Sequence, residues 1–140
     1  AKADYGANQV LFCPNGDVQE TGASNFILIK GNEIITKPLT DEFLHGVTRD
    51  SVLTVAKDLG YTVSERNFTV DELKAAVEEG AEAILTGTAA VISPVTSFVI
   101  GGKEIEVNSQ ERGYALRKAL TDIQYGLAED KYGWLVEVCR

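Results

Sequence analysis

The 140-residue sequence predicts an α+β fold in which an antiparallel-rich sheet is combined with about three helices. Short β-branched, apolar runs separated by Asn-Gly and Gly-Gly turns indicate strand hairpins. Three other segments place apolar residues at helical spacing. Strands and helices do not alternate regularly, which argues against a doubly wound parallel sheet. The length fits one domain, residues 1–140, because two ordinary cores need a longer chain.

The first third of the chain is expected to form antiparallel hairpins. The expected strands are residues 9–13, 18 onward, 25–30 and 33–36. Asn15-Gly16 joins the first pair, because this dipeptide supplies the positive φ angles of a tight turn, and Gly31-Asn32 joins the second. Pro38 ends the pairing because it has no N–H for the ladder.

The middle of the chain is expected to hold two helices separated by a strand. The first helix covers residues 49–59 and is capped by Gly60. Its apolar residues at helical spacing are Val52, Val55, Ala56 and Leu59. Residues 61–68 form the expected strand. Thr69 and Glu72 then match a capping box, which predicts the start of a second, amphipathic helix.

The last third of the chain is expected to return to strands and to end in a helix. The expected strands are residues 83–86, 91–100 and 103–107. Gly101-Gly102 makes the last hairpin turn. A helix over residues 112–125 turns its apolar side chains inward and stops at Gly126. The tail, residues 134–138, is apolar enough to dock on the domain.

Charge and composition argue against several classes of partner. A net charge of −8 opposes nonspecific attraction to nucleic acid or to anionic membranes. No apolar run is long enough to cross a bilayer, and the first residues lack the layout of a signal peptide. A cytoplasmic location is the expectation, or an organelle if the source is a eukaryote. Cys13, Cys139 and His45 lack the spacing of a metal site, so we expect no metal.

The loop before the first helix carries candidate binding chemistry. It covers residues 43–50 and ends where free backbone N–H groups and the helix dipole favour an anion such as phosphate. Gly46 permits close approach, and Thr48 adds a hydroxyl. The same pattern fits a capped helix with Thr48 as the N-cap. Arg49 is either a ligand or, as is more common, a solvated or salt-bridged residue.

A second candidate loop interrupts two apolar strands with small residues over positions 85–94. A ligand can reach the backbone amides of such a loop. Thr88 offers a hydroxyl and an amide, and Ala89 and Ala90 offer N–H groups. A β-bulge or a sheet corner explains the pattern equally well. Glu20, just before an apolar strand, is a third candidate, although most glutamates are simply exposed.

Four ordered stretches of the chain resemble branched-chain amino acid aminotransferases, which are pyridoxal-phosphate enzymes of the fold-type IV group. The stretches are QVLFCPNGDVQETGASNFILI, ITKPLTDEFLHGVTRDSVL with KDLGYTVSER behind it, TGTAAVISPV, and ALTDIQYGLAEDKYGWLVEV. Four motifs in this order make chance similarity implausible. The resemblance implies the C-terminal pseudo-barrel domain of that fold, and a homodimer for the full-length protein.

The resemblance also implies a role for individual residues. The positions that match the family's cofactor contacts are Glu20, Leu44, Val47, Thr48 and Thr88. In the family the matched glutamate contacts the pyridine nitrogen of pyridoxal 5'-phosphate, the apolar residue lies against its ring, and the others hold the phosphate. The positions that match substrate contacts are Ala23, Ala89 and Ala90. His45 departs from a proline that is common in the family.

One part of the family pattern has no counterpart in this sequence. Family enzymes need a lysine that forms a Schiff base with the cofactor, and it lies further before the matched glutamate than the stretch preceding Glu20 extends. Each of the eight lysines in this chain lies in another motif. We therefore expect that the N-terminal, lysine-bearing half is absent, that the chain holds no catalytic residue, and that it is inactive alone.

The implied reaction is reversible amino transfer between Leu, Ile or Val and 2-oxoglutarate. The expected partners are accordingly small amino acids, 2-oxo acids and the missing half of the enzyme. Two alternatives stay open. One is a D-amino acid aminotransferase or a carbon–carbon lyase of the same fold, and the other is a non-catalytic binding or interaction module.

Overall fold

The computed structural model describes residues 6–40, 46–89 and 91–138. Most of the strands form a five-stranded sheet with the order β3-β2-β1-β4-β5. The strands are β1 (Asn25–Lys30), β2 (Glu33–Thr36), β3 (Thr62–Glu65), β4 (Glu82–Gly87) and β5 (Val91–Pro94). Strand β1 is antiparallel to both β2 and β4, and β4 is antiparallel to β5, whereas β2 and β3 are parallel. The antiparallel-rich sheet is therefore confirmed.

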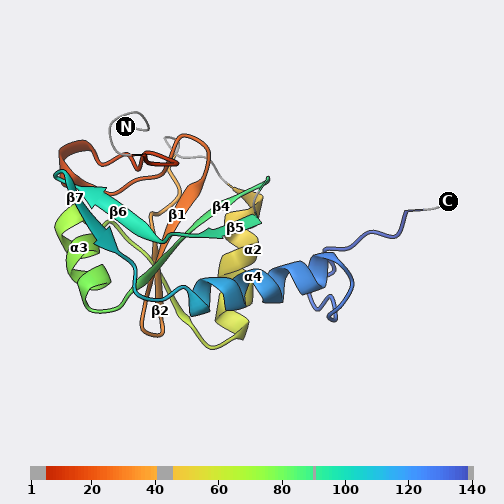
Figure 1. Cartoon of the computed structure of the whole chain (residues 1–140). Helices are drawn as coiled ribbons and strands as arrows, with labels where there is room; N and C mark the ends of the chain where they lie inside the picture. Colours follow the sequence, from red (N-terminus) through yellow and green to blue (C-terminus); the bar gives the residue numbers. More distant parts are fainter. Residues whose placement is uncertain (1–5, 41–45, 90, 139–140) are drawn as a thin grey trace.

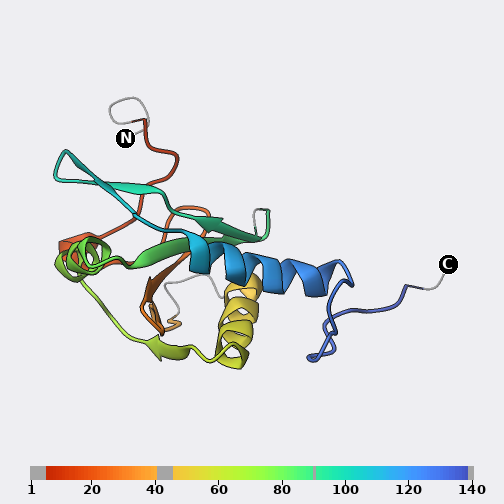
Figure 2. The same ribbon diagram turned by 60° about the horizontal axis from the view of Figure 1, so that its bottom comes forward.

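In the described residues, a two-stranded sheet and three α-helices complete the fold. The two short strands are β6 (Ser97–Ile100) and β7 (Lys103–Glu106). The helices are α2 (Val47–Asp58), α3 (Val70–Glu78) and α4 (Glu111–Gln124). Helices α2 and α4 lie on one side of the molecule and α3 on the other (Figure 2). The α+β class and its three helices are confirmed.

Local sequence signals explain where two of these helices begin or end. The hydroxyl of Thr69 accepts a hydrogen bond from the Glu72 amide at 3.2 Å, as the capping box predicts. Gly60 follows helix α2 with a φ of +91°, a conformation that glycine adopts without steric cost. Both helix boundaries were therefore predictable from a few neighbouring residues.

Strand β1 is buried on both faces, because helices or strands cover each side of the sheet. Ile27 and Ile29 belong to a core cluster with α2 and α4. Phe26 and Leu28 point to the opposite face and belong to a second cluster, with α3 and with partly buried residues of β6 and β7. This alternation follows from the two-residue period of a strand, and it makes β1 the central support of the fold.

The N-terminal segment differs from its prediction. Asn15 and Gly16 have positive φ angles, as expected, but they lie in a short 3₁₀ helix, η1 (Pro14–Gly16). On either side of it the chain makes an isolated bridge between Leu11 and Thr21 instead of two strands. The expected strands at 9–13 and from 18 onward are therefore wrong. The turn residues fix the reversal of the chain, but a single bridge does not make a strand pair.

The C-terminal tail also differs from its prediction. Tyr132 donates a hydrogen bond to Asp58 at the end of α2, which raises the pKa of the Tyr132 phenol to about 12, and it stacks on Trp134 with ring centroids 4.3 Å apart. Beyond this contact Val136 and Val138 are 83% and 81% exposed. The tail extends away from the sheet (Figure 1), so the expected docking of residues 134–138 is wrong.

Helix α4 is attached to strand β4 by one buried carboxylate. Oε1 of Glu82 accepts hydrogen bonds from the Ser109 hydroxyl and the Arg112 amide at 3.1 and 3.2 Å, and Oε2 accepts one from the Gly113 amide at 3.0 Å. A negative charge at a helix N-terminus is favourable, because the free N–H groups and the dipole face it. Glu82 thus anchors the first turn of α4 to the sheet.

We expect Glu82→Gln to lower the free energy of unfolding by about 1–3 kcal/mol, because the new NH₂ group would face a backbone donor and the helix would lose its negative partner. Urea denaturation followed by circular dichroism measures the change. Glu78→Gln, on the exposed surface of α3, is the matched control. Identical unfolding curves for Glu82→Gln and the unsubstituted chain would show that Glu82 is no anchor.

Candidate functional site

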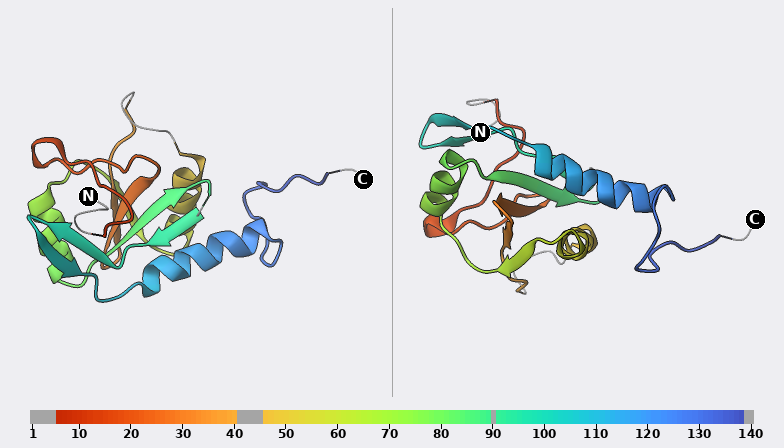
Figure 3. Two further views of the ribbon diagram at one scale, coloured as in Figure 1. Left: turned by 45° about the horizontal axis from the view of Figure 1, so that its top comes forward. Right: turned by 90° about the horizontal axis from the view of Figure 1, so that it is seen from below.

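Three segments that are far apart in the sequence meet at one end of the sheet. The segment before β1 leads into Asn25, the first residue of β1, which lies opposite Thr86 in the β1–β4 ladder. Gly46, at the start of α2, approaches the Asn25 side chain, and Gly87 approaches Ser24. The start of α2 and the β4–β5 turn lie at the same end of the molecule (Figures 1 and 3).

The start of helix α2 depends on a glycine. A Cβ on Gly46 would come within 2.2 Å of Oδ1 of Asn25, a distance that no real side chain tolerates. Gly46 is also the N-cap residue, and no side chain caps the helix there. The interpretation of Thr48 as the N-cap is therefore wrong, since Thr48 lies inside the first turn.

The first turn of α2 presents backbone N–H groups suited to an anion. The amides of Val47 and Thr48 belong to the first helical turn, whose N–H groups have no acceptor within the helix. The helix dipole adds a partial positive charge at this end, which attracts an anion by about 0.3–1 kcal/mol at exposed sites. Thr48 is half-buried and adds a hydroxyl. These groups together make a turn with the donors that a phosphate needs.

A buried guanidinium fixes the same helical turn to the sheet. Arg49 is 2% exposed, and it donates to Glu65 of β3 at 2.6 Å, to Asp50 at 3.0 Å and to the carbonyl oxygen of Lys37 at 2.9 Å. Of the two interpretations of Arg49, the salt-bridged one is confirmed. These contacts join the first turn of α2 to β3 and to the segment after β2.

The second candidate loop forms the turn of the β4–β5 hairpin. Gly87 pairs with Val91, and the exposed Thr88 and Ala89 form a turn directly after Gly87. Val91 has a φ of +56°, a conformation that costs a β-branched residue on the order of 1–3 kcal/mol. The described residues of the second candidate loop, Thr88 and Ala89, therefore lie in an exposed turn.

Glu20 lies in the segment that leads into β1. Its Oε2 accepts a hydrogen bond from Nδ2 of Asn25 at 2.9 Å. The turn between them is held by the Thr21 hydroxyl, which accepts hydrogen bonds from the amides of Ala23 and Ser24 at 3.3 and 2.9 Å. Glu20 is half-buried and Ala23 is exposed. One short turn therefore positions both candidates at the end of β1.

Polar atoms gather behind this end of the sheet. A cavity of about 10 Å³, close to the size of one water, is lined by residues that include Glu20, Asn25, Thr36 and Arg49. The hydroxyl of Thr86 is buried, and among the described residues it has no hydrogen-bond partner. Buried polar groups normally find partners, so the unpaired hydroxyl of Thr86 is an unusual feature of this region.

The structure brings most of the predicted site residues to this end of the sheet. They are Glu20, Ala23, Val47, Thr48, Thr88 and Ala89. Leu44, His45 and Ala90 lie outside the described residues. Asn25 and Thr86 were not predicted, and the only signal in the sequence is a polar residue at the end of an otherwise apolar strand.

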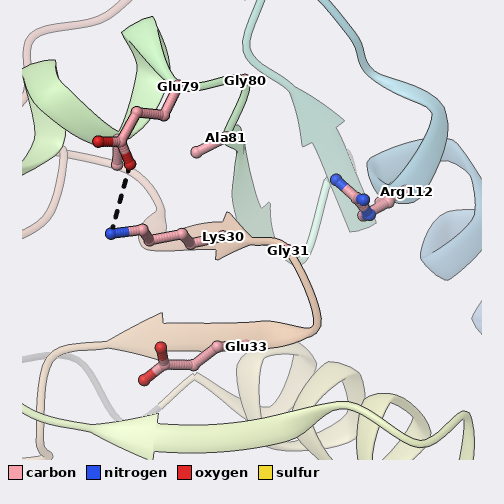
Figure 4. Close-up of a pocket in the computed structure, with 8 residues that line it drawn as sticks. Lys30, Gly31, Glu33, Glu79, Gly80, Ala81 and Arg112 are labelled. Atoms are coloured by element: carbon pink, nitrogen blue, oxygen red, sulfur yellow. Dashed lines mark ion pairs between the residues drawn. The ribbon is translucent and has the colours of Figure 1, made fainter.

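A larger pocket than the cavity near Glu20 lies at the other end of β1 (Figure 4). Its volume is about 440 Å³, and it is lined by residues that include Lys30, Glu33, Glu79 and Arg112. Lys30 and Glu79 are both substantially exposed, and they form an ion pair at 3.7 Å. The pocket combines charges of both signs on solvated side chains. It therefore favours no single kind of ligand, unlike the end of the sheet that holds Glu20.

The described part of the chain offers neither a metal cluster nor a membrane-spanning helix. Within residues 6–40, 46–89 and 91–138, no three His, Cys, Asp or Glu side chains are grouped as metal ligands would be. None of the helices in these ranges is long and apolar enough to span a membrane.

Comparison with known proteins identifies the family. The family described as "Amino-transferase class IV" matches residues 1–98. A probable branched-chain-amino-acid aminotransferase of Staphylococcus epidermidis is 40% identical over 141 residues, which cover 95% of this chain and 39% of the relative. One from Streptomyces coelicolor is 43% identical over 123 residues, which cover 84% and 34%.

Solved structures show the same relationship. The branched-chain amino acid aminotransferase from Escherichia coli matches with a TM-score of 0.81 and 30% identity, over 96% of this chain and 44% of that one. The T.th. branched-chain amino acid aminotransferase, solved with pyridoxamine 5'-phosphate, matches with a TM-score of 0.78 and 30% identity, over 94% and 41%. The fold-type IV expectation is therefore confirmed.

The chain belongs to the class IV aminotransferases. Within that family it is a homologue of the branched-chain aminotransferases, and it spans about two-fifths of the length of the curated relatives that it matches over 95% of its own length. The family resemblance carried by the sequence motifs is thereby confirmed.

We expect Gly46→Ala to lower the free energy of unfolding by about 1–3 kcal/mol, because the added methyl group must displace either Asn25 or the start of α2. Urea denaturation measures the loss. Gly22→Ala is the matched control, since the nearest atom to its Cβ would be a Phe12 ring carbon at an ordinary 3.9 Å. Equal stability of the two variants would contradict the close approach of α2 to β1.

Proposed function

We propose that this chain, as one domain, is the cofactor-binding part of a branched-chain aminotransferase. The reaction of the whole enzyme would be reversible transfer of an amino group between Leu, Ile or Val and 2-oxoglutarate, with pyridoxal 5'-phosphate as the cofactor. The names of its relatives support the substrate class, since the Staphylococcus and Streptomyces proteins are both called branched-chain-amino-acid aminotransferases.

One observation carries the proposal. The first turn of α2, the β4–β5 turn and Glu20 meet at one end of the sheet, although 68 residues separate Glu20 from Thr88 in the sequence. A phosphorylated pyridine carries an anion and a basic ring nitrogen on one rigid ring. Groups suited to each of these are found among the three segments, which supports the binding of one such molecule at this end of the sheet.

The residues present fit the cofactor's phosphate. The amides of Val47 and Thr48, the hydroxyl of Thr48 and the turn at Thr88 would hold it, because each offers an N–H or O–H donor. The absence of side chains at Gly46 and Gly87 lets these donors approach β1 closely. The unpartnered hydroxyl of Thr86 lies beneath this region, next to Asn25 in the ladder.

Glu20 would bind the ring nitrogen. A carboxylate beside that nitrogen favours its protonated form, and a charge-assisted hydrogen bond of this kind contributes roughly 1.5–3 kcal/mol. When bound, the cofactor supplies the electron sink for the substrate Cα, and the protein supplies orientation and charge. The role of Glu20 is to keep a proton at the ring nitrogen.

The substrate would lie beside the two small-residue turns. The exposed amide of Ala89, with Ala90 after it in the sequence, would receive the substrate carboxylate, and the small side chain of Ala23 would leave room for it. Leu44 would contact the cofactor ring, as its position in the motif implies. The full-length protein would be a cytoplasmic homodimer, or would lie in an organelle of a eukaryote.

The proposal predicts that the 140-residue chain has no aminotransferase activity of its own. No lysine of this chain matches the family's Schiff-base lysine, and Lys37, which lines the cavity near Glu20, is ion-paired with Asp17. Incubation with pyridoxal 5'-phosphate, leucine and 2-oxoglutarate should release no 4-methyl-2-oxopentanoate. The full-length Escherichia coli relative is the positive control, and turnover by the chain alone would refute this prediction.

The chain should nevertheless bind pyridoxamine 5'-phosphate through its phosphate. We expect Thr48→Val to weaken this binding about tenfold, because one hydrogen bond to a charged group is lost. Isothermal titration calorimetry measures the affinity, and pyridoxamine without the phosphate should bind more weakly. Thr54→Val, on the solvent side of α2, is the matched control. No phosphate-dependent binding would instead favour a non-catalytic module.

A further inference from the structure

We propose that Asn25 is a positioning residue that holds the Glu20 carboxylate at a fixed distance from the start of helix α2. This inference rests on the proposed function, because it concerns the residue that would bind the ring nitrogen. It adds a residue that neither the motifs nor the loop patterns indicated.

The contact between Asn25 and Glu20 has the geometry of a strong hydrogen bond. Nδ2 of Asn25 donates to Oε2 of Glu20 at 2.9 Å, and the Asn25 residue is only 7% exposed. Hydrogen bonds to an ionised acceptor are stronger than those between neutral groups, and burial strengthens them further. The amide engages one carboxylate oxygen, so the other oxygen can serve the ring nitrogen.

The other end of the same amide lies against helix α2. Oδ1 of Asn25 would be 2.2 Å from a Cβ on Gly46, which means that the carbonyl end lies directly against the Gly46 backbone. A single buried side chain therefore extends from Glu20 to the first residue before the helix. The Nδ2 end faces the Glu20 carboxylate and the Oδ1 end faces the start of α2, and the cofactor would have to contact both of these groups at once.

Asn25 itself cannot shift easily. It is the first residue of β1 and pairs with Thr86, so the strand register fixes its backbone. Gly87, which follows Thr86 at the end of β4, precedes the turn that carries Thr88. The sheet thus sets the position of Asn25, and the hydrogen bond from Asn25 sets the position of the Glu20 carboxylate relative to the start of α2, which Arg49 holds independently.

Asparagine is the side chain that this position requires. Aspartate has the same shape but presents an oxygen where Nδ2 stands, so it would repel the Glu20 carboxylate. Serine would leave a gap, and Glu20 would regain the side-chain freedom that a long, flexible residue loses on ordering. A pyridine nitrogen and a phosphate lie on one rigid ring, so a mobile Glu20 would align with both only part of the time.

The first test uses the free chain and no ligand. Nuclear magnetic resonance couplings report whether the Glu20 side chain has one rotamer. We expect one rotamer in the unsubstituted chain and rotamer averaging in Asn25→Asp and Asn25→Ser. Asn32→Ala is the matched control, because Nδ2 of Asn32 also makes a hydrogen bond, to Gly60, at the far end of β1. An unchanged Glu20 rotamer in both Asn25 variants would overturn the proposal.

The second test separates positioning from general support. It compares pyridoxamine 5'-phosphate with an analogue in which carbon replaces the ring nitrogen. We expect Asn25→Asp and Asn25→Ser to bind pyridoxamine 5'-phosphate about tenfold more weakly and the analogue unchanged, while Asn32→Ala binds both normally. Equal losses for both ligands would assign Asn25 a merely structural role and overturn the proposal.

The two tests also separate this inference from the proposed function. If the unsubstituted chain binds neither ligand, the proposed function fails, and the rotamer measurement still decides whether Asn25 holds Glu20. If the chain binds pyridoxamine 5'-phosphate and the Asn25 variants bind it equally well, the proposed function stands and the positioning role is wrong.

Discussion

The candidate site depends on where helix α2 begins, and the buried guanidinium of Arg49 fixes that point. Its hydrogen bonds to Glu65 and to the Lys37 carbonyl oxygen tie the first helical turn to strand β3 and to the segment that follows β2. A buried charge that loses its partner costs roughly 3–5 kcal/mol, so this arrangement has few alternatives. With the helix start held beside β1, a side chain at position 46 would collide with Asn25 unless one of them shifted.

Much of the fold was predictable because short-range rules determine it. The capping box at Thr69 and the glycine after α2 act through neighbouring residues, and both are confirmed. The errors have a common cause. At Asn15-Gly16 the turn forms, but the segments on either side of it make a single bridge, between Leu11 and Thr21. A longer strand pair depends on tertiary contacts that the local sequence does not determine. The tail, through Val138, is apolar, but no surface of the described chain covers its last residues.

The site was predictable to a smaller extent, because its residues come together only in three dimensions. Local patterns favoured Thr48 as a helix cap, whereas the close contact between Gly46 and Asn25 puts the cap two residues earlier. Glu20 has only a weak local signal, an acid just before an apolar strand, and the family motif gave it a role. Asn25 remained unnoticed for the same reason, since its importance comes from facing Glu20 and Gly46 at once, which no spacing in the sequence reveals.

Strand β4 connects helix α4 to the exposed turn between β4 and β5. Glu82, at one end of the strand, is clamped to helix α4, while Thr88 follows its other end. Helix α4 therefore stiffens the strand that carries this turn, and it does not need to contact the turn itself. A turn on a stiffened strand loses little conformational entropy when a ligand binds, which favours tight binding. Substitutions that loosen helix α4 would consequently lower the affinity for a ligand at the turn.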